Sequence, residues 1–383
     1  MTHEDTAKKN LYVQVVHSSL TTDLVNAVDQ ALATGIKSLM ILRCTANRLD
    51  FELLNNYLPS LSVPVFGGIF PAIIIEGQNY ETGSVVCGFY LEAQTCPLSP
   101  LSEYDGSIAN TLSEIAERYR APGAVIAIGD GLSPFLDHLI GTLYNHLGAD
   151  VIVSGGGAGR LDFISEPCVI TNEGVLADAA QIVHLPLESG VGVHHGWEKI
   201  SGPYLVTKAT ENIIQTLNYK PAFELYQKVV GSISNTKIGV ENFLAISKRF
   251  PFGMEKLDDE LVVRDPIKVE DNSLHCVGLV PEHTMLYILE GNDNKLIEAA
   301  GQAAKEALQQ LQQHTPVCTL VFDCITRALF LENRFASELE RVVASIGSDT
   351  PIVGALTLGE IASSSMGGIQ FLNKTTVINV LGE

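Results

Sequence analysis

The sequence predicts an α/β protein whose repeated strand–helix–strand units form two mixed or largely parallel sheets covered by helices, in two domains. Three observations predict this fold class. Short, continuously apolar segments alternate with helical stretches, strands ending in glycine recur three times, and hydrophobic residues make up 46% of the 383 positions. Strands that are apolar throughout are buried on both faces, as they are in sheets covered by helices.

The repeat consists of a strand, a helix and a second strand, and a further apolar strand follows each copy. Its irregular spacing indicates related α/β units and not a solenoid. The expected strand, helix and strand of the three copies are 38–42, 51–58 and 63–68; 124–128, 134–147 and 150–157; 318–322, 334–345 and 350–355; the strands that follow are 84–90, 180–185 and 375–381.

Local signals predict further helices and a division of the chain. A helix over 22–34 ends at Gly35, and an Ala-, Leu- and Lys-rich stretch predicts a long helix over 294–313. A third helix begins near Pro221 and runs to Val230. We place the division between about 199 and 221, which gives an N-terminal domain over 11–199 and a C-terminal domain over 221–382.

Composition narrows the functional classes. The chain has 24 basic and 44 acidic residues, a formal net charge of -20, and no basic run, which argues against nucleic acid binding. No apolar run reaches the about 18 residues needed to cross a bilayer, and no signal-peptide pattern is present. We therefore expect a cytoplasmic protein. Its seven cysteines form no Cys-x-x-Cys pair and are expected to be reduced, with a zinc or iron–sulfur site from separated cysteines as the alternative.

A glycine cluster follows the second repeat's last strand, in the segment 154–160. Gly156, Gly157 and Arg160 are candidate ligand-binding residues, because glycines at a strand end let backbone N–H groups approach a phosphate. The segment lacks the Gly-Lys-Ser/Thr ending of a P-loop, and a strand or loop follows it where a helix would be needed. The alternative is a tight turn at a ligand-facing sheet edge, where only glycine avoids crowding.

The run His194-His195-Gly196-Trp197 contains the only tryptophan and is expected at the end of a strand. One interpretation is a packed indole beside a hydrogen-bonded imidazole. The other is a ligand pocket or a haem iron ligand, since neutral imidazole is a common axial ligand.

Two further candidates follow strands of the third repeat. The segment 322–327 contains Asp323, Cys324 and Arg327 at a strand end, where α/β sheets commonly bind ligands. An Arg–Asp pair in that place serves equally well as a structural ion pair. Glu360 follows the last repeat strand in a glycine-rich context and is a candidate anchor for an amine or an amide of a ligand.

The sequence carries no Gly-x-Ser-x-Gly elbow, no His-Glu-x-x-His motif and no spacing that singles out a catalytic triad. We therefore expect a protein that is not an enzyme, with no catalytic residues. The enzyme alternative is a reaction in which Cys324 or Cys44 acts as a nucleophile, which would require a depressed thiol pKa.

Several of these segments together resemble the FIST sensor family over nearly the whole chain. The matching segments are 192–197, 202–208 and 221–226 in the centre, and 322–327, 350–354, 358–361 and 373–375 near the C-terminus. The resemblance implies an N-terminal and a C-terminal FIST domain and a sensory input module of signal transduction that binds a small ligand.

The chain also resembles a stand-alone FIST branch that binds haem and senses nitric oxide. That resemblance implies haem b as cofactor and a sensor histidine kinase with cyclic-di-GMP signalling as the regulated partner system. It makes His195 the first choice for the iron ligand, with His138, His146 and His184 in reserve, and Trp197 a pocket residue. The alternative is a FIST module that binds an amino acid or another metabolite without haem. A homodimer is compatible with the sequence, which does not fix the oligomeric state.

Overall fold

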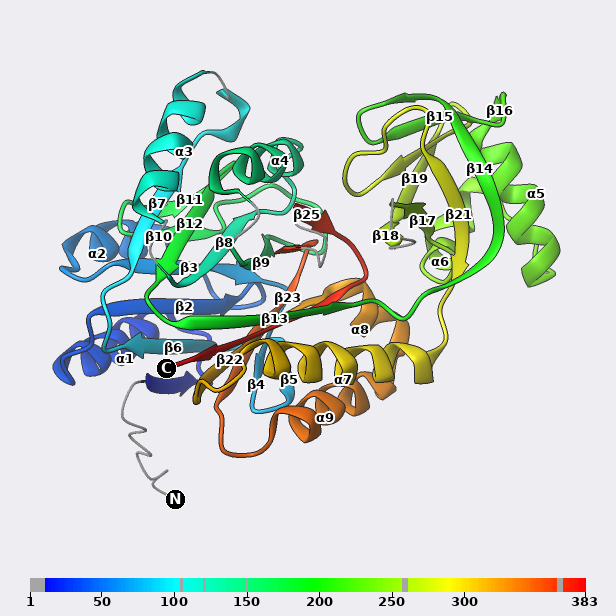
Figure 1. The fold of residues 1–383 in the computed structure, drawn as a ribbon. Helices are drawn as coiled ribbons and strands as arrows, with labels where there is room; N and C mark the ends of the chain where they lie inside the picture. The colour runs from blue at the N-terminus through cyan, green and yellow to red at the C-terminus, as the bar shows by residue number, and fades with distance from the viewer. Residues whose placement is uncertain (1–10, 104–105, 120–121, 149–150, 257–260, 364–367) are drawn as a thin grey trace.

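The computed structural model describes residues 11–103, 106–119, 122–148, 151–256, 261–363 and 368–383 (Figure 1). It confirms the predicted α/β class, with mixed sheets covered by helices. Within these residues, none of the helices has the length and apolar character needed to cross a membrane.

Three parallel strand pairs, each connected through a helix, form the repeat predicted from the sequence. Residue 150, the first of the second copy's last predicted strand, lies outside the described residues. The copies are β2 (Ser38–Cys44), α2 (Phe51–Tyr57) and β3 (Val65–Phe70); β8 (Ala124–Asp130), α4 (Leu136–Leu147) and β9 (Val153–Ala158); β22 (Pro316–Cys324), α8 (Ile325–Leu331), α9 (Phe335–Ile346) and β23 (Ile352–Thr357).

A further strand pairs antiparallel with the first strand of each copy, as predicted, and an outer strand pairs with that one in turn. The inner strands are β6 (Ser84–Phe89), β12 (Ala180–Leu185) and β26 (Thr376–Gly382); the outer strands are β1 (Leu11–Val16), β7 (Gln94–Leu98) and β13 (Glu188–His194).

A hairpin follows the last strand of each repeat and pairs with the sheet of a neighbouring repeat. The three six-stranded sheets formed in this way have the same strand order. The hairpin that follows β3 pairs with β23, the one that follows β9 pairs with β3, and the one that follows β23 pairs with β9. The hairpins are β4 (Ala72–Ile75) with β5 (Gln78–Tyr80), β10 (Val169–Thr171) with β11 (Gly174–Leu176), and β24 (Glu360–Ser363) with β25 (Ile369–Leu372). Because of this exchange, segments from both predicted domains share two of the sheets.

A fourth sheet stands beside these three and is reached by the long continuation of β13 (Figure 1). Helices α5 (Ala222–Ser234) and α6 (Phe243–Ser247) belong to the same segment. Its strands are β14 (Glu198–Thr210), β15 (Ile213–Leu217), β16 (Lys220–Pro221), β17 (Phe252–Glu255), β18 (Leu261–Arg264), β19 (Pro266–Glu270), β20 (Ser273–Cys276) and β21 (Met285–Glu290).

The described strands therefore form four sheets where the sequence suggested two. Strand patterns reveal apolar segments but not the exchange of hairpins, and three strands of the fourth sheet, β17, β18 and β19, lie in the segment 232–271, whose mixed composition predicts loops. The domain limits 11–199 and 221–382 stay a prediction. The remaining helices are α1 (Thr21–Ala33), α3 (Gly106–Arg118) and α7 (Asp293–Gln310).

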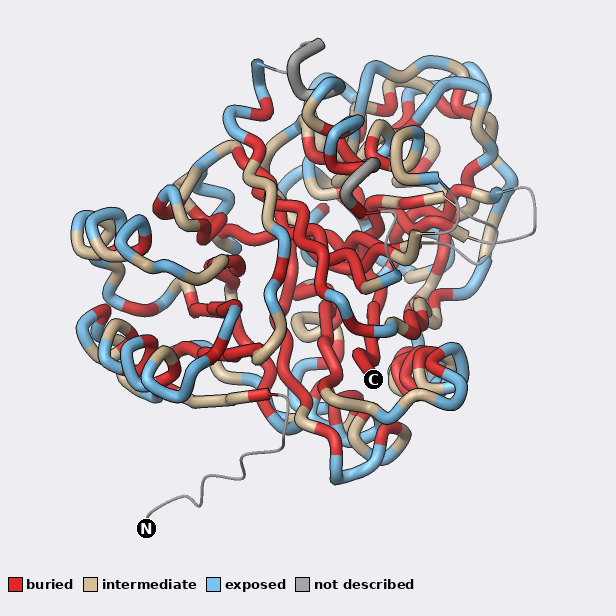
Figure 2. Tube along the Cα trace, turned by 60° about the vertical axis from the view of Figure 1, so that its left-hand side comes forward, coloured by how far each residue is buried: buried red, intermediate tan, exposed pale blue. Residues whose placement is uncertain are grey.

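The repeat strands form the interior of the molecule, where the chain is almost entirely buried (Figure 2). Glycine is required where two strands approach most closely. A Cβ on Gly155 would lie 1.8 Å from the Ala127 carbonyl oxygen, and one on Gly67 would lie 1.9 Å from that of Ile41. The glycines that end the predicted strands therefore serve close packing of the parallel pairs.

Candidate functional site

The candidate site is a cavity of about 320 Å³ between the strand-end loops of the second and third repeats and the fourth sheet. Such a junction, at the carboxyl ends of parallel strands, is a favoured place for ligands. The lining residues are 131–134, Asp137, Leu161, Phe163, Glu211, Asn212, Asp265, Ile267, 276–279, 324–326, Leu358, Gly359, Phe371 and Asn373.

The first strand of each repeat ends at an equivalent residue. Cys44, Asp130 and Cys324 each end the first strand of a copy, and each backbone N–H donates to the carbonyl that precedes the paired antiparallel strand. Cys324 lines the cavity, and Asp130 stands beside it next to Gly131. Neither Cys44 nor Asp130 is among the lining residues, so Cys324 is the one of these three equivalent residues that lines the cavity.

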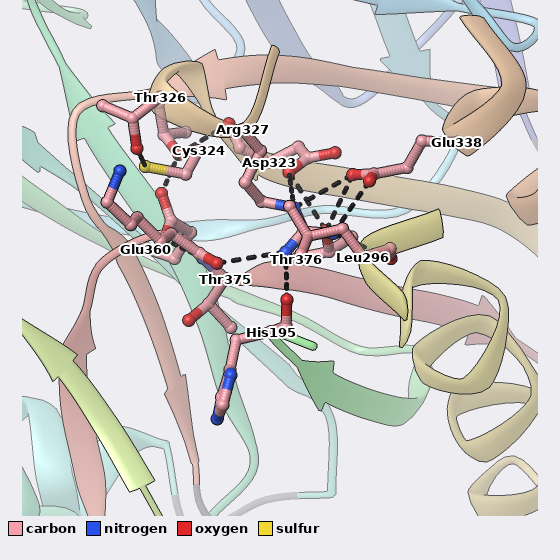
Figure 3. A network of polar contacts seen from close by, with 12 residues as sticks. His195, Leu296, Asp323, Cys324, Thr326, Arg327, Glu338, Glu360, Thr375 and Thr376 are labelled. Carbon is pink, nitrogen blue, oxygen red and sulfur yellow. Dashed lines mark hydrogen bonds and ion pairs between the residues drawn. The ribbon is translucent and has the colours of Figure 1, made fainter. Parts of the chain in front are cut away.

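Beneath the cavity, Arg327 is fully buried in a network of polar contacts (Figure 3). Its guanidinium donates to both Glu338 carboxylate oxygens, with Nε–Oε1 at 3.0 Å and Nη2–Oε2 at 2.8 Å, and lies 3.2 Å from Asp323 Oδ1. Burial, followed by the nearby Glu338 charge, raises the pKa of Asp323 well above its ordinary value. The positive charge of Arg327 therefore compensates two carboxyl groups, Asp323 and Glu338, that are buried next to each other.

The same guanidinium fixes three separate segments of backbone. Arg327 Nη1 donates to the carbonyl oxygens of His195 and Lys374, at 2.6 and 3.1 Å, and Nη2 donates to Leu296 in α7 at 3.0 Å. Trp197 Nε1 also donates to the Lys374 carbonyl, at 3.1 Å. With these partners the Arg327 side chain holds the end of β13 and residue 374 in place, which makes it a positioning residue behind the cavity.

Lys374 joins this network to the cavity wall. Its Nζ lies 3.1 Å from Asp265 Oδ2 and 3.0 Å from the Lys248 carbonyl oxygen, and it stands 4.9 Å from the centre of the Trp197 ring. Both charged side chains are buried, and Asp265 lines the cavity. Burial raises the pKa of Asp265, and the Lys374 ammonium opposes that shift.

Asn373 lines the cavity, and its side chain carries an unsatisfied acceptor. The residue is 2% exposed and its Nδ2 donates to the Leu372 carbonyl at 2.8 Å. Its Oδ1 is buried and has no hydrogen-bond partner among the described residues. Buried polar atoms are normally paired, and an unpaired one costs about 1–3 kcal/mol, so Asn373 is suited to accept a hydrogen bond from a bound molecule.

Glu360 and Cys324 form a buried acidic pair next to the cavity. Glu360 accepts from Thr357 Oγ1 at 2.8 Å and from the Thr375 N–H at 3.2 Å, and it interacts with the Cys324 thiol. Burial raises the pKa of Glu360 to about 8. Burial and the adjacent Glu360 also raise the pKa of the Cys324 thiol, and burial raises that of Cys44 to about 12. These directions are opposite to those of an activated nucleophile.

Glycines of the segment 154–160 pack closely against the end of β23 and the residue that follows it. Gly156 and Gly157 lie in β9, where a Cβ on Gly156 would meet the Thr357 methyl group at 2.5 Å and one on Gly157 would meet the Leu358 carbonyl oxygen at 2.4 Å. Arg160 lies beyond the strand and pairs with Asp162 and Glu166, at 2.6 and 3.2 Å. No helix begins after the glycines in this described segment, so it lacks the helix N-terminus of a phosphate loop.

The predicted iron ligand His195 lies just past β13, and its ring points away from the Arg327 network (Figure 3). Its Nδ1 accepts from the Trp197 N–H at 2.9 Å, and burial with the Arg327 charge lowers its pKa to about 4, so the imidazole is neutral. His195 is not among the residues that line the cavity.

The reserve histidines do not line the cavity either. His138 is exposed on α4, His146 lies 3.1 Å from Ser113 Oγ, and His184 is buried against the Tyr119 ring. No group of three or more potential metal-binding side chains is found among the described residues. None of the described lining residues of the cavity offers an imidazole, so a haem iron held by one of these histidines would lie outside the cavity.

The sequence pointed to Cys324, Arg327, Glu360, His195 and Trp197, and the structure gathers them around one network. It missed Asn373, Lys374, Asp265 and Asp137, whose partners come from distant parts of the chain. A signal was present for Asn373 and Lys374, because the segment 373–375 is one of those that resemble the FIST family. Asp137 lies in α4 and Asp265 lies between β18 and β19, and no distinctive spacing marks either residue in the sequence.

Comparison with family models finds two adjacent matches. Residues 38–220 match the FIST N domain and residues 222–363 match the FIST C domain. No curated protein matches the chain. The cavity draws its lining from both matched regions, since Gly131 and Asp137 belong to the first and Asp265 and Cys324 to the second.

Proposed function

Because the chain belongs to the FIST family, whose domains are sensor modules for small ligands in signal transduction, we propose that the cavity beside Asn373 is its sensory ligand site. The observation that carries the proposal is the buried Asn373 Oδ1, an acceptor without a described partner that belongs to a residue lining the cavity. A ligand that donates a hydrogen bond there removes the cost of that unpaired atom.

The contacts behind the cavity offer a route for a signal. Asn373 is followed by Lys374, whose carbonyl accepts from Trp197 and Arg327, while Arg327 also holds the α7 carbonyl of Leu296. A ligand that shifts the segment 373–374 acts on all these contacts at once. We therefore propose that α7 and the end of β13 transmit occupancy to a partner protein.

A metabolite thermal-shift screen tests the ligand site, because a ligand that binds only the folded state raises the unfolding temperature. Ile267→Trp fills the cavity, whereas Ile233→Trp places the same indole on the exposed side of α5. We expect a metabolite that stabilises the wild type and Ile233→Trp but not Ile267→Trp. A metabolite that stabilises all three proteins equally would place the binding site elsewhere.

The haem and nitric oxide expectation stays a prediction that rests on the family resemblance. Since no described histidine lines the cavity, an iron bound through His195 would stand outside it. The absorption spectrum of protein purified from haem-supplemented cells tests this, with His195→Ala as the variant. A Soret band that shifts with nitric oxide and disappears in His195→Ala supports haem, and a colourless protein that also fails to take up haemin rejects it.

Regulation of a sensor histidine kinase and of cyclic-di-GMP signalling likewise stays a prediction, as does a homodimer. Kinase autophosphorylation in the presence of the purified protein tests the first, and sedimentation equilibrium tests the second. An unchanged autophosphorylation rate with and without ligand would reject regulation of the kinase used in the assay.

A further inference from the structure

We propose that the sensed ligand is an organic cation, an ammonium group carried on a compact apolar body, and that it binds with the ammonium at Asn373 and Asp265. This assignment rests on the proposed function, because it concerns the same cavity. Four observations lead to it: the sign of the lining charges, the engagement of the nearby cations, the unpaired Asn373 acceptor and the apolar remainder of the wall.

The charged side chains that line the cavity all carry the same sign. They are Asp137, Glu211 and Asp265, and no lysine or arginine is among the described lining residues. Glu211 is exposed, while Asp265 is buried on the wall. A negatively charged ligand entering this cavity therefore meets carboxylates without meeting a cation that can pair with it.

The two cations behind the wall are already occupied. Lys374 Nζ contacts Asp265 Oδ2 and the Lys248 carbonyl oxygen. The Arg264 guanidinium donates to the carbonyl oxygens of Leu279, Val263 and Phe371, and lies 3.6 Å from Asp137 Oδ2. These contacts direct both cations toward protein oxygens, so they do not serve as anchors for a ligand carboxylate or phosphate.

The unpaired atom at the site is an acceptor, and this selects a donor. Asn373 Oδ1 needs an N–H or O–H from the ligand, since Nδ2 of the same amide already donates to Leu372. Asp265, whose Oδ2 pairs with Lys374, also lines the cavity and adds a carboxylate. An ammonium group, with three donors and a positive charge, satisfies both groups, whereas a hydroxyl satisfies only the hydrogen bond.

The rest of the wall is apolar and sets the size of the ligand. Leucine, isoleucine, valine and phenylalanine side chains surround the polar end, and the cavity of about 320 Å³ is at the small end of the roughly 300–1,000 Å³ range of ligand pockets. Phe163 and Leu161 are exposed as well as part of the lining, which places them at the opening. A short cyclic or aromatic body fits this description better than an extended polar molecule. The apolar wall consists of Leu132, Leu161, Phe163, Ile267, Val277, Leu279, Ile325, Leu358 and Phe371.

Shape-matched probes test the assignment. Titration calorimetry compares phenethylamine, cyclohexylethylamine and tryptamine with the alcohol and the carboxylic acid of each body, at neutral pH. We expect at least one amine to bind, the matching alcohol to bind more weakly, and the matching carboxylate to give no heat. A carboxylate that binds as tightly as its amine overturns the assignment.

Variants at Asn373 test the contact itself. Asn373→Leu should weaken the amine about tenfold or more, the loss expected for a hydrogen bond to a charged group, while Asn373→Asp should tighten it. Asn56→Leu on the exposed side of α2 is the matched control and should leave the affinity unchanged. Unchanged amine binding in both Asn373 variants contradicts the assignment, and Asn373→Asp keeps the test valid if the leucine variant does not fold.

The outcome also separates this inference from the proposed function. If no amine binds but the metabolite screen still gives a stabilising compound that Ile267→Trp rejects, the ligand class is wrong and the cavity remains the sensory site. If the screen also finds no compound that depends on the cavity, both proposals are wrong.

Discussion

Arg327 and Glu338 meet face to face in the interior, with both guanidinium–carboxylate contacts at 3.0 Å or less and neither side chain exposed. The pair joins α8 to α9, and through the other donors of Arg327 it also holds β13 and α7. Neither residue is among those that line the cavity. The pair fixes the backbone at residue 374, next to Asn373, relative to β13 and α7.

Replacing Arg327 by methionine should strongly destabilise the protein. The change leaves Glu338 and Asp323 buried without their cation, and loss of one partner of a buried pair typically costs about 3–5 kcal/mol. Urea unfolding measures the loss in free energy of unfolding. Arg334→Met is the control, because Arg334 pairs with Asp293 on the surface, where such a pair is worth about 0–1 kcal/mol. Equal losses in the two variants would show that the buried network is not a stabilising centre.

Glu360 should make the stability depend on pH. Its folded pKa of about 8 lies above the ordinary value of 4.5, so the folded state binds more protons than the unfolded state between these values. Stability is therefore favoured at low pH and falls as pH rises toward 8, with a slope of at most about 1.4 kcal/mol per pH unit from this group.

Glu360→Gln removes that titration, so its free energy of unfolding should fall less steeply than that of the wild type between about pH 5 and pH 8. Urea unfolding at a series of pH values gives both curves, and Glu298→Gln on the exposed side of α7 should follow the wild type. Parallel curves for wild type and Glu360→Gln would mean that Glu360 is ionised in the folded protein throughout this range.

Gly155→Ala should be severely destabilising although it adds one methyl group. The new Cβ would lie 1.8 Å from the Ala127 carbonyl, at a backbone φ of +156°, so β8 and β9 must separate, at a cost of about 3 kcal/mol or more. Gly141→Ala, within α4, meets nothing within 4 Å and should stabilise by about 0.4–1 kcal/mol. Thermal unfolding of both variants checks the contrast, and a neutral Gly155→Ala would contradict the close strand approach.

The cysteines should differ in reactivity. Cys96 is the one described cysteine that is not buried, and the pKa of Cys324 is raised. We expect iodoacetamide to modify Cys96 first and Cys324 only after unfolding, because the thiolate is the reactive form. Peptide mass spectrometry after timed alkylation measures this order. Rapid, selective alkylation of Cys324 in the folded protein would restore the nucleophile alternative.

Much of the fold was predictable because each repeat carries its own local signals. Apolar strands ending in Gly67, Gly155 and Gly354 mark the three parallel pairs, and each requires glycine for the same steric reason. The exchange of hairpins was not predictable in this way. Ile73 pairs with Ala355, and Ile361 pairs with Gly155, across separations in sequence that no local pattern encodes.

The candidate site was predictable to a similar extent. Cys324, Arg327 and Glu360 were found because they follow strands, where ligand sites gather. Asn373 and Asp265 were missed because their importance depends on burial and on missing or distant partners, such as the unpaired Oδ1 and the Lys374 contact. An unsatisfied buried atom leaves no trace in the sequence.

Hydrogen–deuterium exchange tests most directly whether the cavity is the sensory site. It compares the free protein with the protein bound to the compound that gives the largest thermal shift. The account predicts slower exchange in the segments 131–137, 276–279 and 358–363, each of which contains residues that line the cavity, and in 368–375 around Asn373. Slower exchange confined to another region, such as the groove lined by Arg249, Asn292 and Arg334, with no change around Asn373, would contradict it.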